Sequence, residues 1–150
     1  MIRKRIEKEL LTIEQENHLV KVDKEDTYYT VVAKLFGPTD TVFENGEYLV
    51  RITVNLDSYP FNPPEVIFLS EIYHPNISGD SICIDILQDQ WSSAMTLLST
   101  LKSLENLLND PNPDSPLDSD AAEAFMSNSE EYSQRNAEMM IRNKENPVST

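Results

Sequence analysis

The chain has 150 residues, of which 39% are hydrophobic and 25% are charged, and its net charge at pH 7 is −14. These values are typical of one soluble globular domain that is long enough to bury its own core. The acidic excess argues against nucleic-acid binding, which needs clustered Lys and Arg, and no apolar run is long enough for a membrane span. A single cysteine and the lack of a signal peptide predict a cytoplasmic or nuclear location.

The first half of the chain predicts one helix followed by strands. Residues 2–17 place isoleucines and leucines on one face of an amphipathic helix, which also carries the basic residues Arg3, Lys4, Arg5 and Lys8. Residues 27–36 and 65–69 are rich in β-branched and aromatic side chains, and residues 47–56 alternate apolar and polar positions. These three segments predict antiparallel strands.

The second half predicts an irregular stretch and then helices. Residues 70–91 show no sustained periodicity, and a long irregular segment in a compact domain usually carries function. Leucines at 97, 101, 104 and 108 predict a central helix that ends before Asp110-Pro111. Shorter helices are expected over 118–126 and 129–144, followed by a frayed tail at 146–150. Because strands and helices are segregated along the chain, the predicted class is α+β.

The irregular stretch contains the only cysteine, Cys83. A lone cysteine is often a small buried hydrophobic residue, so a structural thiol is one interpretation. A Cys-His hydrolase is disfavoured, because Pro75 fixes the backbone of His74 and His18 lies near the end of the first helix. One cysteine and two scattered histidines also make no zinc site. A thiol with the nearby carboxamide of Asn76 suits acyl transfer from a thioester to an amine, with the amide as oxyanion donor.

Over essentially its whole length the chain resembles the ubiquitin-conjugating enzymes. Six motifs carry this resemblance, in the order and at nearly the spacing of the family: Phe36-Gly37-Pro38, Tyr59-Pro60-Phe61-Asn62-Pro63-Pro64, Tyr73-His74-Pro75-Asn76, Ile82-Cys83-Ile84-Asp85-Ile86-Leu87, Trp91-Ser92 and Asp110-Pro111-Asn112-Pro113. The resemblance implies one domain over 1–150 with the UBC fold. This fold has an N-terminal helix, a four-stranded antiparallel meander, a central helix and two C-terminal helices.

The resemblance also implies a function. Such an enzyme accepts ubiquitin from an activating enzyme as a thioester and passes it to a lysine of a substrate protein, with a RING or U-box ligase. No cofactor is implied, because the activating enzyme uses the ATP. A monomer without nucleic-acid or membrane partners is expected. Two alternatives stay open: a conjugating enzyme for another ubiquitin-like modifier, and a catalytically silent scaffold, which the presence of both Cys83 and Asn76 disfavours.

Individual roles follow from the matching positions. Cys83 carries the thioester, Asn76 stabilises the oxyanion or the local loop, Asp85 lies beside the cysteine, and Ser115 lies at the gate opposite it. The remaining positions are expected to bind partners: Arg3, Lys4, Arg5 and Lys8 the activating enzyme, Phe61, Asn62, Ser93 and Ala94 the ligase, and Lys102 and Asn106 the donor modifier.

The chain departs from the family pattern at four places. The loop from Asn76 to Cys83 is one residue shorter than usual. Ser115 stands where many members carry aspartate, and Ser93 replaces a frequent proline in the second ligase loop. Lys102 lies where a ubiquitin-carrying member often has an apolar residue, which motivates the alternative of a different modifier.

Overall fold

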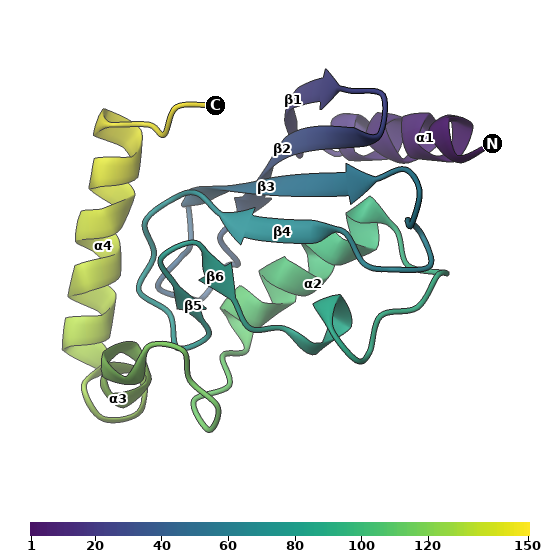
Figure 1. Ribbon diagram of the computed structural model, residues 1–150. Coiled ribbons are helices and arrows are strands. Elements are labelled where there is room, and N and C mark those ends of the chain that lie inside the picture. Colours follow the sequence, from purple (N-terminus) through teal and green to yellow (C-terminus); the bar gives the residue numbers. More distant parts are fainter.

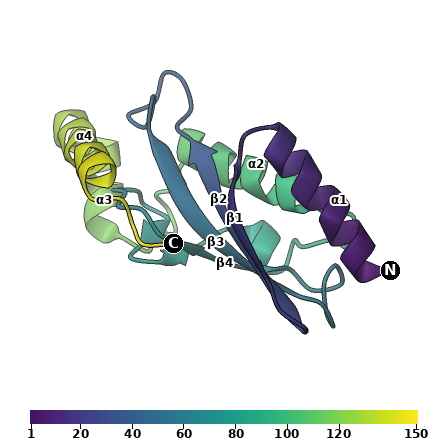
Figure 2. The ribbon, with the colours of Figure 1, turned by 90° about the horizontal axis from the view of Figure 1, so that it is seen from above.

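The computed structural model describes all residues from 1 to 150. Four antiparallel strands form one sheet in the order β1 (Leu19–Lys24), β2 (Tyr28–Phe36), β3 (Glu47–Asn55) and β4 (Glu65–Phe68). In Figure 1 this sheet lies above α2 (Leu97–Asn109), with α1 (Ile2–Gln15) at one end and α3 (Ser119–Ser127) and α4 (Ser129–Glu145) at the other. Figure 2 shows the same separation from above. The predicted α+β class and UBC-like architecture are confirmed.

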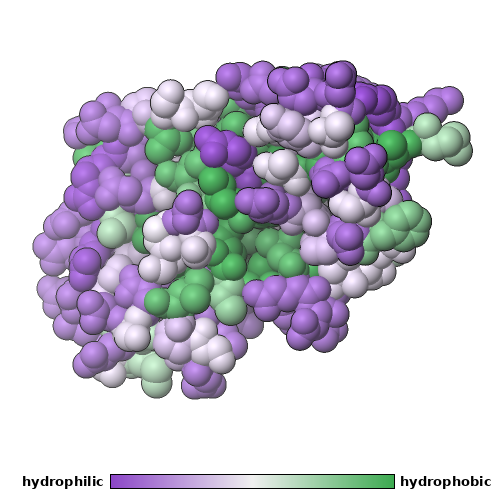
Figure 3. All heavy atoms as spheres, viewed as in Figure 1, coloured by the Kyte–Doolittle hydropathy of each residue, from purple (hydrophilic) through white to green (hydrophobic).

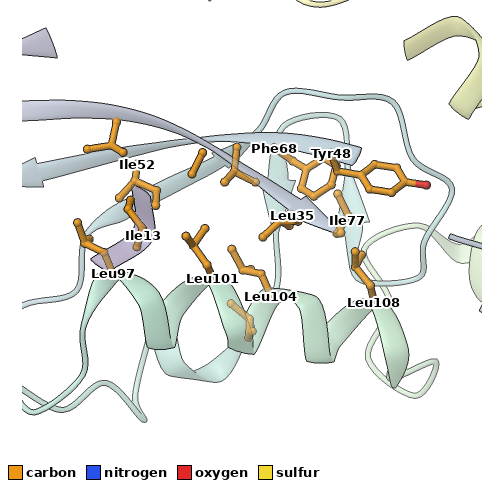
Figure 4. Close-up of a cluster of buried hydrophobic side chains, with 14 of the residues drawn as sticks. Ile13, Leu35, Tyr48, Ile52, Phe68, Ile77, Leu97, Leu101, Leu104 and Leu108 are labelled. Carbon is orange, nitrogen blue, oxygen red and sulfur yellow. The ribbon is translucent and has the colours of Figure 1, made fainter. Parts of the chain in front are cut away.

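The core fills the space between the sheet and α2 (Figure 4). The alternation predicted for the third strand is correct, because Tyr48, Val50, Ile52 and Val54 are all buried. The four leucines predicted to form one face of the central helix are also buried. Burial of each such side chain stabilises the fold by about 1.5–3 kcal/mol.

Helix α1 ends at Gln15, two residues before the predicted end. Asn17 adopts the left-handed conformation, with a φ of 64°. The next residue, His18, donates its N–H to the carbonyl of Ile13 at 2.9 Å, and Asn17 donates to Glu14 at 3.0 Å. This pair of bonds is the Schellman motif, which satisfies the last carbonyls and stops the helix.

Strand β1 is not one of the three strands that sequence periodicity predicts. It is an edge strand whose pairing with β2 shifts register between Leu19 and Lys21. This irregularity breaks the alternation of buried and exposed residues, so the segment carries no period-two signal. The four-stranded sheet was expected from the family resemblance alone, and that expectation is correct.

The turn between β2 and β3 depends on one glycine. The N–H of Gly37 donates to the carbonyl of Gly46 at 2.8 Å, which closes the turn. A Cβ atom at residue 37 would overlap the backbone carbonyl of Phe43, which is itself in the core. Only glycine therefore fits at this position.

The irregular middle contains two short strands, β5 (Ile77–Ser78) and β6 (Ser81–Ile82), followed by the 3₁₀ helix η1 (Asp85–Leu87). The two strands form a separate antiparallel hairpin. The N–H of Phe68 at the end of β4 donates to the carbonyl of Asp80 at 2.9 Å, which ties the hairpin to the sheet. None of the helices combines the length and apolar character needed to cross a membrane.

Candidate active site

Cys83 directly follows β6 and is partly exposed. Its N–H donates to the carbonyl of Asn76 at 2.9 Å, so the two residues lie side by side across the hairpin. The hairpin turns through Gly79 and Asp80 alone, and Gly79 has a φ of 61°. A two-residue turn with glycine first is a favoured hairpin connection. The shortened loop is thus accommodated as a tight hairpin that keeps Asn76 next to Cys83.

The side chain of Asn76 is only 2% exposed and binds the loop that follows α2. Its Nδ2 donates to the carbonyls of Asn112, at 2.8 Å, and Ser115, at 3.4 Å. Its Oδ1 accepts the N–H of Asn112 at 2.8 Å. These contacts agree with the expected role in stabilising the local loop. A role as oxyanion donor stays a prediction, because it requires the amide to turn away from these carbonyls.

His74 fixes the same segment from the interior. Its Nδ1 accepts the N–H of Asn76 at 3.0 Å, and its Nε2 bonds the carbonyl of Leu107 at 2.9 Å. Burial lowers the pKa of His74 to about 4, and the bond to Leu107 opposes this shift only in part. The imidazole is therefore neutral at physiological pH. Both ring nitrogens are occupied, as the prediction of a structural histidine requires.

A groove of about 690 Å³ begins one residue after Cys83 and runs between η1 and α2. The segment after the cysteine contributes Ile84, Asp85 and Ile86 to one wall. The predicted modifier-contact residues Lys102 and Asn106 lie on the α2 wall. Figure 3 shows the face of the molecule seen in Figure 1, on which hydrophobic residues gather in a central hollow bordered by hydrophilic ones.

Lys102 is the only lysine or arginine between Arg51 and Arg135. Its ammonium lies 3.7 Å from carboxylate oxygens of both Glu16 and Glu105. Half of the Lys102 side chain remains exposed, so these pairs contribute little to stability. The groove therefore has one cation on its α2 wall, held toward the end of α1. Ser115 is exposed, and only its backbone carbonyl contacts another predicted site residue.

The two predicted ligase loops lie next to each other. The indole N–H of Trp91 in the second loop donates to the carbonyl of Pro60 in the first at 2.8 Å. Phe61 is 81% exposed, and Asn62, Ser93 and Ala94 are also exposed. An exposed phenylalanine on a loop with three prolines is an accessible apolar contact. The four predicted ligase residues thus form one surface.

Beneath these loops lies a buried carboxylate that sequence reasoning missed. Glu9 is 8% exposed. Its Oε1 accepts the hydroxyl of Tyr59 and the N–H of Leu97, both at 2.7 Å. Its Oε2 accepts Nε of Arg5 at 2.8 Å. One carboxylate therefore joins α1, the first loop and the start of α2, where a negative charge is favourable.

Arg5 differs from the other basic residues of α1. Its Nη2 donates to the carbonyls of Ser93, at 3.2 Å, and Met95, at 3.0 Å. The hydrogen bond to Glu9 raises the pKa of Arg5 above its ordinary value. Arg3, Lys4 and Lys8 are all exposed, and Arg3 also donates to the carbonyl of Asp26 at 2.6 Å. Arg3, Lys4 and Lys8 therefore offer exposed cations on α1, Arg5 also supports the second loop, and the binding of an activating enzyme by these four residues stays a prediction.

Other residues that sequence reasoning missed are Asn112, which holds the side chain of Asn76, and Asn136 on α4. No local motif marks Glu9 or Asn136, because their partners lie far away along the chain, and the motif that contains Asn112 did not indicate its contact with Asn76. Nowhere in the structure do three or more His, Cys, Asp or Glu side chains come together to hold a metal ion.

Comparison with known proteins agrees with this geometry. Residues 3–140 match the family model described as ubiquitin-conjugating enzyme. Human ubiquitin-conjugating enzyme E2 K is 40% identical over 136 residues, which are 89% of this chain and 68% of the relative. Ubiquitin-conjugating enzyme E2 2 of Mycosarcoma maydis is 43% identical over 104 residues, covering 69% of this chain and 56% of the relative.

Two solved structures share the fold. The E2 domain of a Toxoplasma gondii ubiquitin-conjugating enzyme superposes with a TM-score of 0.82 at 32% identity, covering 93% of this chain and 96% of that one. A structure described as a ubiquitin-conjugating enzyme of Plasmodium yoelii gives a TM-score of 0.78 at 34% identity, with 91% of each chain covered. The family match spans the sheet, the Cys83 hairpin and most of α4, and the chain belongs to the ubiquitin-conjugating enzyme family.

Proposed function

We propose that Cys83 accepts ubiquitin from an activating enzyme as a thioester and that the chain then transfers it to a substrate lysine with a RING or U-box ligase. The position of Cys83 supports this proposal most directly. Cys83 is partly exposed, and the groove along α2 begins at the next residue and offers a course for an extended C-terminal tail.

The first step is a thioester exchange. The Cys83 thiolate attacks the carbonyl carbon of the thioester on the activating enzyme. The new C–S bond forms as the old one breaks, and the activating enzyme's thiolate leaves. The proton that Cys83 lost balances the proton that the departing thiolate takes up. Because one thioester replaces another, the step needs no strong base near Cys83.

The second step forms the isopeptide bond. A neutral lysine amine attacks the thioester carbonyl, and the tetrahedral oxyanion collapses with the Cys83 thiolate as leaving group. The amine loses a proton to solvent or to a nearby carboxylate such as Asp85. For Asn76 to donate to the oxyanion, its Nδ2 must first give up its hydrogen bond to the carbonyl of Asn112. Removing one oxyanion donor typically costs about 10²–10³ in rate.

A charging assay tests the activity. The chain is mixed with activating enzyme, ATP and ubiquitin, and adducts are separated with and without a reducing agent. Wild type should form a reducible adduct and Cys83→Ala none, whereas Cys83→Ser should form an oxyester that resists thiols. Absence of an adduct with every activating enzyme would exclude the proposal and favour a silent scaffold.

The role of Asn76 is tested at the second step. Asn76→Ala should still charge but discharge slowly to free lysine, because both the oxyanion donor and the anchor of the 112–115 loop are lost. Discharge at the wild-type rate would show that neither role limits the reaction.

The identity of the modifier is a separate question. Lys102 places a cation on the groove wall where an apolar contact is common in the family, and this observation keeps another ubiquitin-like protein as the second candidate. Charging with a panel of modifiers, for wild type and Lys102→Leu, separates the two. A preference for ubiquitin in both chains would remove the alternative.

The partner surfaces are tested by single substitutions. Lys4→Ala and Lys8→Ala should slow charging by weakening contact with the activating enzyme. Phe61→Ala should leave charging intact and reduce only ligase-stimulated discharge. Loss of charging in Phe61→Ala would contradict this division of surfaces.

A further inference from the structure

Helix α4 holds the segment that leads to Asn76 with two asparagines seven residues apart. Asn136 accepts the N–H of Tyr73 on Oδ1 and donates to its carbonyl from Nδ2, both at 2.9 Å. Asn143 makes the same pair of bonds with Glu71, again at 2.9 Å each. Residues seven apart lie on one face of a helix, so α4 holds this extended segment as a neighbouring strand would.

The two asparagines differ in burial. Asn136 is 1% exposed and makes a third bond, to the carbonyl of Tyr132 at 3.1 Å. Asn143 is partly exposed. A fully satisfied buried amide fixes its partner more firmly than an exposed one, because water cannot replace its bonds. Asn136 is therefore the stronger of the two anchors.

Tyr73 is the first residue of a connected path to the cysteine. The next residue, His74, bonds the N–H of Asn76, and the carbonyl of Asn76 accepts the N–H of Cys83. On its other side the Tyr73 ring packs on the guanidinium of Arg135, at 4.0 Å from the ring centre. A displacement of the Tyr73 peptide therefore passes through His74 and Asn76 to the backbone of Cys83.

We propose that Asn136 is a positioning residue for the thioester site. Its amide sets the place of the Tyr73 peptide, and thereby the position of Asn76 relative to Cys83. This inference rests on the proposed role of Cys83 as thioester carrier. Misplacement of a catalytic group by about 1 Å can cost about 10²-fold in rate, so a loss at this distance from the chemistry is measurable.

The test compares Asn136→Leu with Asn143→Leu in the full chain. Leucine has the branched outline and the number of side-chain heavy atoms of asparagine, although its methyl groups are bulkier, and each substitution removes one complete pair of bonds to the 71–73 segment. Single-turnover discharge of the ubiquitin thioester is measured over a range of free lysine concentrations. Asn136→Leu should charge within about twofold of wild type and discharge at least about tenfold more slowly at saturating lysine. The lysine concentration for half-maximal rate should stay unchanged, and Asn143→Leu should match wild type in both steps.

Amide hydrogen exchange at Cys83 gives a readout that does not depend on chemistry. Its N–H should exchange faster in Asn136→Leu and at the wild-type rate in Asn143→Leu. If Asn136→Leu does not fold, Asn136→Asp replaces it, because the aspartate keeps the acceptor for the Tyr73 N–H and loses the donor. The same direction of change is then expected.

The outcomes are distinct. Wild-type discharge and exchange in a folded Asn136 variant would overturn the positioning role, as would an equal loss in Asn143→Leu, which would indicate general loosening of α4. A wild-type chain that never charges would instead refute the function on which the inference rests.

Discussion

Acidification should destabilise the protein through His74. The folded chain holds its buried imidazole neutral with a pKa of about 4, whereas the ordinary value in an unfolded chain is 6.5. Between these two pH values the unfolded chain binds a proton that the folded chain does not. The free energy of unfolding therefore falls as the pH drops from about 6.5 to about 4. This difference in pKa corresponds to about 3 kcal/mol, a substantial fraction of a domain's stability.

Two measurements check this expectation. Urea unfolding of wild type and His74→Gln at several pH values between 7 and 4 isolates the contribution of His74, because the carboxylates are common to both chains. Wild type should lose about 3 kcal/mol more than the variant over this range. NMR titration of the ring protons gives the pKa directly, with His18→Gln used to assign the two signals.

The structure also predicts how protonation of His74 affects the neighbouring amide of Asn76. Once protonated, Nδ1 of His74 can no longer accept the N–H of Asn76, so the Asn76 amide should exchange faster near pH 4. Parallel stability curves for wild type and His74→Gln, or a His74 ring that titrates near 6.5, would refute the reasoning.

Three further predictions concern stability and the ligase loops. Gly37→Ala should destabilise the fold by about 3 kcal/mol or more in urea unfolding, because the new Cβ would overlap a backbone carbonyl. In Gly79→Ala the new Cβ meets no atom, so this variant should lose only about 1–2 kcal/mol, the cost of placing alanine in the left-handed conformation. Equal losses of stability in the two variants would contradict this. Thr96→Val removes the side-chain cap of α2 and should lower the free energy of unfolding, measured by thermal unfolding, by about 1 kcal/mol. Unchanged stability would show that water replaces the cap. Glu9→Gln presents a hydrogen-bond donor to Arg5 and should lower the free energy of unfolding by about 1.5–3 kcal/mol. Amide exchange in residues 91–97 should become faster, and ligase-stimulated discharge should become weaker. Unchanged slow exchange in residues 91–97 would exclude a role of Glu9 in holding the loops.

The elements that sequence predicted well are those whose burial follows a regular period. The leucines of α2 and the alternating residues of β3 satisfy this condition, and both elements form where expected. Strand β1 does not, because its register shift removes the alternation. The end of α1 was missed by two residues, because a left-handed asparagine rather than a glycine or proline stops the helix.

Candidate site residues could be proposed from the sequence where the residue type and its own exposure suggest a role, and those roles stay predictions. Cys83 and Phe61 are of this kind, and the structure leaves both accessible. Glu9 and Asn136 act through buried bonds to residues 88 and 63 positions away along the chain. Such contacts depend on how the elements pack, so no local sequence pattern predicts them. For the same reason the sequence did not indicate that Arg5 binds the Glu9 carboxylate and the carbonyls of Ser93 and Met95.

The anchoring of Asn76 bears on how the sequence near the cysteine can vary. All three bonds of its side chain go to main-chain atoms, those of residues 112 and 115. The anchor therefore does not depend on the side chain at position 115. A serine there in place of the family's frequent aspartate leaves these bonds in place. The side chain at position 115 can thus change without loss of the bonds that hold Asn76 beside the thiol.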